Sequence, residues 1–198
     1  MSTADQQHAE RLHDAATGEH FTSPFTLGAL VEQLSNLRRP PELAELNTWL
    51  GRVEPLRTEL RPHVSFKADT YARHRVFISQ HVELLVLCWR PGQRTPIHDH
   101  NGSYGTVRVL EGVMWETIFR LDGARGLAYE TAREWTPGQT TEGADIPDIH
   151  QIGNPDISGQ DLISLHAYAP PLASINTFRI GSTASVNTIC MNSWNPTI

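Results

Sequence analysis

The chain has 198 residues, and 16 Lys and Arg against 22 Asp and Glu give a net charge of −6 and a pI near 5.9. Its basic residues form no block, so we expect no nucleic acid or membrane partner, and no obligate protein partner is evident in the sequence. The longest apolar run, 84–89, is far too short to span a bilayer. The N-terminus lacks the apolar core of a signal peptide, and two cysteines give no disulfide framework, which favours a reducing, cytoplasmic location.

The first third of the chain predicts a helical head. Residues 1–22 show no periodicity, and we expect them to be disordered. Leucines at helical spacing predict one helix that begins at Ser23-Pro24 and a second that follows Pro40-Pro41. A third, short helix is expected from Glu54 to Leu60. Residues 1–62 should therefore form a head that packs on the remainder of a single structural domain.

From residue 63 to residue 198 the pattern predicts a mostly β body. Short β-rich runs separated by Gly, Pro and Asn are typical of an all-β sandwich or barrel. The expected strands include 82–89, 106–110, 113–121 and 161–168. Glu111-Gly112 lies between two of these strands and suggests that they form a hairpin.

Two histidines, His98 and His100, are separated by one residue. Side chains at i and i+2 of a strand point the same way, so the pair could bind one ion. Neutral imidazole suits iron, zinc, copper and nickel. The alternative is a pair of surface histidines in a polar loop.

Glycines around this pair give the chain a resemblance to the cupin superfamily, whose first motif reads G-x5-H-x-H-x(3,4)-E-x6-G. Gly92, the two histidines and Gly112 match, whereas Gly105 stands at the acidic position. His150, followed four residues later by Asn154, is similar to the end of the second cupin motif. The resemblance implies a small antiparallel barrel of the jelly-roll type, with a metal in its mouth.

The metal ligands implied by this resemblance are His98, His100 and His150. Three neutral imidazoles leave a divalent ion its full positive charge, which favours an anionic ligand such as a thiolate. Three-histidine sites also bind zinc, so the ligand set alone does not select the metal.

Further segments resemble one branch of the cupins, cysteine dioxygenase type I. They are Leu87-Cys88-Trp89, Ile97-His98-Asp99-His100, Leu110-Glu111-Gly112, the run from Ser164 to Pro171 that reads S-L-H-A-Y-A-P-P, and Tyr71-Ala72-Arg73. The resemblance covers roughly residues 71–171. It implies iron(II) as the cofactor, and a small thiol and O2 as substrates.

Ser164, His166 and Tyr168 alternate along the last predicted strand, so they share one face. Such a face is often only the solvated side of a sheet. In the family it points inward, and the resemblance then implies that the three residues form a catalytic relay. Tyr168 would present its hydroxyl near the metal, His166 would orient it, and Ser164 would fix the histidine tautomer.

The resemblance also implies that Arg73, with Tyr71, binds the substrate. A guanidinium offers a planar fork to a carboxylate. Arg75 has the same strand parity and is the nearest alternative. A Gln usually replaces this Arg in the related 3-mercaptopropionate dioxygenases, so Arg73 favours cysteine.

Gly105 is a departure from the vertebrate enzymes, in which a Cys at this position forms a thioether with the active-site Tyr. We expect no such Cys–Tyr cofactor here, as in many bacterial members. The expected activity is the iron(II)-dependent oxidation of L-cysteine to cysteine sulfinic acid. The alternatives are another small thiol acid (3-mercaptopropionate or mercaptosuccinate), a non-catalytic metabolite-binding cupin, and a zinc-dependent isomerase.

Overall fold

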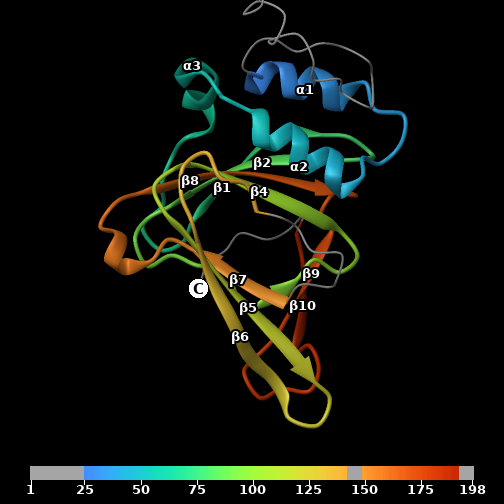
Figure 1. Ribbon diagram of the computed structural model, residues 1–198, viewed down its shortest axis with the longest axis vertical. Coiled ribbons are helices and arrows are strands. Elements are labelled where there is room, and N and C mark those ends of the chain that lie inside the picture. Colours follow the sequence, from blue (N-terminus) through green and yellow to red (C-terminus); the bar gives the residue numbers. More distant parts are fainter. Residues whose placement is uncertain (1–24, 142–148, 192–198) are drawn as a thin grey trace, which may run out of the picture.

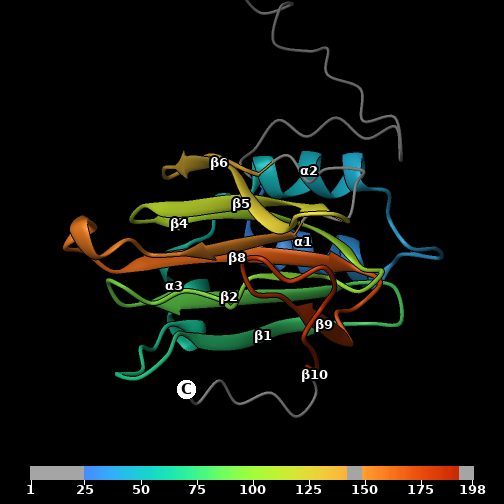
Figure 2. The ribbon, with the colours of Figure 1, turned by 90° about the horizontal axis from the view of Figure 1, so that it is seen from below.

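The computed structural model describes residues 25–141 and 149–191. Two antiparallel sheets face each other, and the helices cover the outer face of one of them (Figures 1 and 2). The expected disorder of residues 1–22 and the helix start at Ser23-Pro24 lie outside the described residues. Within the described ranges, no helix is long and apolar enough to cross a membrane.

The head contains α1 (Leu27–Ser35), α2 (Leu43–Arg52), α3 (Arg57–Leu60) and the 3-10 turn η1 (Arg61–His63). The first helix begins at Leu27, and the Thr26 side chain caps it by accepting a hydrogen bond from the Ala29 amide. The third helix is shorter than the predicted 54–60. The division of the domain after residue 62 stays a prediction.

The body is mostly β, as predicted, and has the two-sheet architecture of a cupin. The four-stranded sheet has, in order, β1 (Ala72–Ile78), β2 (Glu83–Trp89), β8 (Leu162–Ala169) and β4 (Tyr104–Glu111). The six-stranded sheet has, in order, β10 (Asn187–Cys190), β9 (Ser174–Thr177), β3 (His98–Asp99), β7 (Ile149–Gly153), β5 (Met114–Asp122) and β6 (Gly126–Trp135). A further 3-10 turn, η2 (Asp156–Ser158), follows β7.

The predicted hairpin around Glu111-Gly112 is wrong. Its two strands, β4 and β5, belong to different sheets, and β5 pairs instead with β6 and β7. Gly112 has φ +81°, and a Cβ there would lie 2.3 Å from the Asp161 carbonyl oxygen. This glycine therefore lets the chain pass closely under β8 as it crosses between the sheets. Strand periodicity marks each strand but does not say which neighbour it pairs with.

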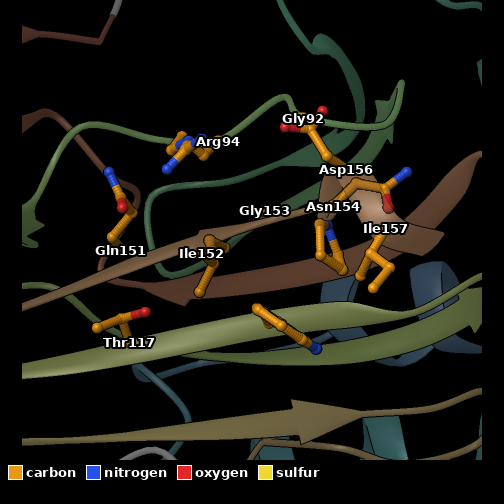
Figure 3. Close-up of a pocket in the computed structure, with 11 residues that line it drawn as sticks. Gly92, Arg94, Thr117, Gln151, Ile152, Gly153, Asn154, Asp156 and Ile157 are labelled. Atoms are coloured by element: carbon orange, nitrogen blue, oxygen red, sulfur yellow. The ribbon is translucent and has the colours of Figure 1, made fainter. Parts of the chain in front are cut away.

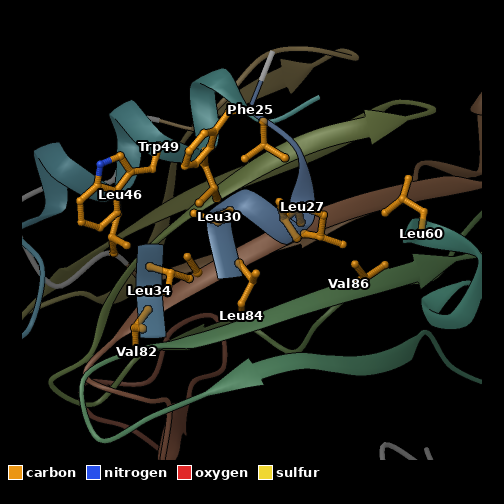
Figure 4. Packing of buried hydrophobic residues seen from close by; sticks show 14 of the residues in the cluster. Phe25, Leu27, Leu30, Leu34, Leu46, Trp49, Leu60, Val82, Leu84 and Val86 are labelled. Carbon is orange, nitrogen blue, oxygen red and sulfur yellow. The ribbon is translucent and has the colours of Figure 1, made fainter. Parts of the chain in front are cut away.

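Three apolar clusters are buried in the described part of the chain, and the two largest pack on opposite faces of the four-stranded sheet. The first packs the helices on the outer face of the four-stranded sheet, where Leu30 and Trp49 lie among residues of β2 and β8 (Figure 4). The second fills the space between the sheets and includes Trp89. Every residue of β8 is buried, so both of its faces are inside the protein. The interpretation of its polar face as a solvated surface is therefore wrong.

Substitution of Leu30 tests whether packing of the helical head stabilises the four-stranded sheet. The side chain is fully buried in the first cluster, so Leu30→Ala should lower the free energy of unfolding by about 2–5 kcal/mol. Urea denaturation measures the change. Leu56→Ala is the matched control, because Leu56 is 56% exposed, and it should cost less than about 1 kcal/mol. Equal losses in the two variants would mean that the head does not stabilise the sheet.

Candidate metal centre

The three predicted metal ligands come together between the sheets. Strands β3 and β7 are neighbours, and His98 lies directly opposite His150 in their register. His100 follows the short β3, and the chain then turns at Asn101, whose φ is +46°. One ligand atom from each histidine lies within 4.8 Å of those of the other two.

The ring nitrogens of the three histidines fit a shared ion. His150 Nε2 and His100 Nε2 face each other at 3.3 Å. Two imidazole ligands bound at about 2.0–2.1 Å would place their nitrogens roughly 3.0–3.4 Å apart. His98 Nδ1 lies 3.0 Å from the Pro96 carbonyl oxygen, which leaves its Nε2 for an ion. The donor set therefore fits a divalent transition metal.

Sequence reasoning missed a carboxylate behind this centre. Glu116, on β5, is buried, and its Oε1 lies 2.9 Å from His150 Nδ1. Trp135 donates to the other carboxylate oxygen from Nε1 at 3.0 Å. Burial alone would raise the pKa of Glu116, but the hydrogen bonds with His150 and Trp135 hold it below its usual value. A signal for it was present in the sequence: Glu116 lies two residues after the apolar Met114 in a predicted strand, so both side chains are expected on the same face.

Burial keeps two of the ligand histidines, His98 and His100, neutral. It lowers the pKa of His98 to about 3, and repulsion from His150 adds to the effect. The pKa of His100 is lowered well below its usual value, first by burial and then by the neighbouring histidines. Because a metal binds neutral imidazole, these rings are ready to ligate at neutral pH.

The predicted relay residues form one hydrogen-bonded row on the inner face of β8. Ser164 Oγ lies 2.8 Å from His166 Nε2, and His166 Nδ1 lies 3.2 Å from the Tyr168 hydroxyl. The Tyr168 ring lies 5.2 Å from that of His100, measured between centroids. Burial lowers the pKa of His166 to about 3 and raises the pKa of Tyr168 to about 12, so both are neutral at pH 7.

Gly105 lies directly opposite Tyr168 in the register of β4 and β8. A Cβ at Gly105 would come within 2.5 Å of Tyr168 Cδ1, so the tyrosine ring occupies the space of a side chain. Gly105, the residue that departs from the cupin motif, therefore lies against the relay tyrosine.

The two predicted substrate residues line a small cavity beside the histidines. Tyr71 and Arg73 share its wall with His98, Tyr168 and Met191, and its volume of about 20 Å³ holds no more than a water molecule or two. Arg73 Nη1 lies 3.7 Å from Met191 Sδ. The alternative residue, Arg75, forms an ion pair with Glu83 at 2.9 Å and is absent from this wall.

A larger cavity, of about 400 Å³, lies elsewhere and contains none of the predicted site residues (Figure 3). It is lined by Gly92, Arg94, Trp115, Thr117, Gln151, Ile152, Gly153, Asn154, Pro155, Asp156 and Ile157. Size alone therefore does not identify the reactive site; the cluster of histidines does.

The neutral His166 predicts how stability depends on pH. An unfolded histidine takes up a proton near pH 6.5, whereas the folded His166 does so only near pH 3. Between these values the unfolded state binds more protons, so the free energy of unfolding should fall with falling pH, by about 1 kcal/mol per pH unit for this residue. Denaturation of metal-free protein from pH 7 to pH 4 measures it. His166→Asn should show a shallower fall, and an identical slope would contradict a buried neutral His166.

Comparison with known proteins identifies the family of this chain. Residues 19–180 match the family model described as cysteine dioxygenase type I. Cysteine dioxygenase type 1 of Danio rerio is 30% identical over 135 residues, which cover 65% of this chain and 66% of the zebrafish protein. The Homo sapiens protein of the same name is 26% identical over 160 residues, covering 78% of this chain and 80% of that protein.

The match to the family model spans most of the chain. The three histidines, the relay row, Tyr71 and Arg73 all lie within it. The chain belongs to the cysteine dioxygenase type I family.

Proposed function

We propose that the protein is an iron(II)-dependent dioxygenase that oxidises L-cysteine to cysteine sulfinic acid. The observation that carries this proposal is that His98, one member of the three-histidine cluster, lines one small cavity together with Arg73 and the relay tyrosine. Bound iron(II) would supply the redox chemistry by which one thiol and one O2 give one sulfinic acid, both oxygen atoms ending on sulfur. His98, His100 and His150 would hold it.

Arg73 would bind the carboxylate of the substrate. The guanidinium lies on the cavity wall with Tyr71, whose phenol stays protonated because burial raises its pKa far above the usual value. A neutral phenol and a charged guanidinium can both donate hydrogen bonds to a carboxylate. Because the cavity is smaller than cysteine, side chains must move as the substrate enters. Met191, which contacts Arg73, has the rotatable bonds to do so.

Tyr168 would act on the thiol end of the substrate as an unmodified tyrosine. Its hydroxyl is held by His166, and its ring lies against His100. Gly105 offers no sulfur for a thioether, and the ring already fills the adjoining space. A neutral hydroxyl in this position would donate a hydrogen bond to the reacting oxygen or sulfur atoms.

A cytoplasmic setting fits the two cysteines. Cys88 is buried, Cys190 is exposed, and neither forms a disulfide. An exposed cysteine that forms no disulfide persists more readily in a reducing compartment.

The direct test is oxygen uptake by protein reconstituted anaerobically with iron(II). The panel should contain L-cysteine, cysteamine, 3-mercaptopropionate and mercaptosuccinate. We expect about one iron per chain and the highest kcat/KM with L-cysteine. His150→Ala should lose tight iron binding and activity, because only two of the three imidazole ligands remain. Iron binding without uptake for any thiol would favour a non-catalytic cupin, and a preference for another thiol would reassign the substrate.

Substitution of Arg73 tests recognition of the carboxylate. Arg73→Ala should lower kcat/KM for cysteine roughly 30- to 1,000-fold, about 2–4 kcal/mol, because it leaves a carboxylate unpaired in a confined site. Cysteamine lacks the carboxylate and should lose little. Arg73→Gln should shift the relative preference toward 3-mercaptopropionate.

The matched control is Arg75→Gln on the same strand. Arg75 pairs with Glu83, and a Gln at position 75 can still donate a hydrogen bond to that carboxylate. This variant should keep the kcat/KM of the unmodified protein for all four thiols. If Arg73→Ala lowered kcat/KM equally for cysteine and cysteamine, Arg73 would shape the site without binding the substrate carboxylate.

A further inference from the structure

The row of relay residues continues beyond Ser164 to a buried tryptophan. Trp89, at the end of β2, is fully buried, and its Nε1 donates to Ser164 Oγ at 2.9 Å. Its ring also stacks on Tyr71 with centroids 4.1 Å apart. The hydrogen-bonded chain therefore runs Trp89–Ser164–His166–Tyr168 across the inner face of the four-stranded sheet.

The tryptophan fixes the direction of this chain. An indole N–H can only donate, so Ser164 Oγ accepts from Trp89. The serine hydroxyl then has one hydrogen to place, and His166 Nε2, at 2.8 Å, is the acceptor within reach. His166 must therefore carry its own proton on Nδ1 and donate it to the Tyr168 hydroxyl oxygen. The hydroxyl hydrogen of Tyr168 is left to point elsewhere.

The opposite direction leaves a hydrogen bond unmade. If His166 Nε2 donated to Ser164, the serine oxygen would accept twice, and its own hydrogen would need another acceptor. Within residues 25–141 and 149–191, Ser164 Oγ has hydrogen-bond partners only in Trp89 and His166. Because Ser164 is fully buried, an unused hydroxyl hydrogen would carry the cost of an unsatisfied donor.

We propose that Trp89 is a positioning residue that sets the direction of the relay, holding His166 as its Nδ1–H tautomer and making Tyr168 present its hydroxyl hydrogen to the cavity. Tyr168 then acts as a hydrogen-bond donor to a bound molecule and not as an acceptor. The neutral state of the buried His166 agrees with this assignment. The consequence for turnover rests on the proposed dioxygenase function, whereas the tautomer does not.

The tautomer is tested by NMR of ¹⁵N-histidine-labelled protein loaded with diamagnetic zinc(II). The His166 signals are assigned by their absence in His166→Asn. We expect Nδ1 to carry the proton and Nε2 to be unprotonated. In Trp89→Phe and in Ser164→Ala the signals should shift toward a mixture of tautomers. An Nε2–H tautomer in the unmodified protein overturns the proposal, as does an unchanged tautomer in a folded Trp89→Phe.

Turnover gives a second, independent test. Trp89→Phe keeps an aromatic ring but loses the donor, so kcat for cysteine should fall roughly 10-fold while KM stays within about twofold. In a Ser164→Ala background the same substitution should have no further effect, because Trp89 acts through Ser164. If the two substitutions instead lowered kcat independently, so that their fold-changes multiplied, the proposal would be overturned.

Trp49→Phe is the matched control for lost packing. Trp49 is buried in the head and belongs to the other apolar cluster. Its substitution should lower the thermal midpoint of unfolding while leaving the His166 tautomer and kcat unchanged. A change of tautomer in this variant would mean that general loosening, and not the indole hydrogen bond, moves the proton.

Discussion

Burial of both faces of β8 is the constraint on which the site depends. The outer residues of this strand lie under the helical head, in the same cluster as Leu30 and Trp49. The alternating residues on the inner face are polar and equally buried, so they must satisfy one another's hydrogen bonds. The head is therefore part of the site's construction, because it covers one face of the strand that carries the relay on the other.

The metal centre depends on the opposite sheet. Adjacent strands place His98 opposite His150, and the turn after β3 brings His100 to the same point. The carboxylate that the cupin motif would place at position 105 is missing here. Glu116 instead holds a carboxylate one hydrogen bond behind His150. Such a group would orient the ring and strengthen it as a donor without neutralising the charge of a bound ion.

The residues proposed to bind the substrate and the proposed relay lie close together between the two sheets. Trp89 stacks on Tyr71 and donates to Ser164, so one buried indole touches both the recognition residues and the relay. Arg73 and Arg75 are two residues apart on β1, and Arg75 forms an ion pair with Glu83. Strand parity alone could not separate the two arginines, because the partner of Arg75, Glu83, comes from the neighbouring strand β2.

Local patterns in the sequence determined the helices of the head, several strands, the histidine triplet and the shared face of Ser164, His166 and Tyr168. The helices, the strands and the shared face follow from periodicity, which acts over a few residues, whereas the set of three histidines follows from the resemblance to the cupin motifs. Tertiary structure decided which sheet each strand joined, and so overturned the hairpin at Gly112. It also decided that the polar face of β8 points inward and that Glu116 and Trp89 complete the site. Those contacts join residues 34 and 75 positions apart, and no local pattern encodes such pairs because they form only when two sheets close on each other.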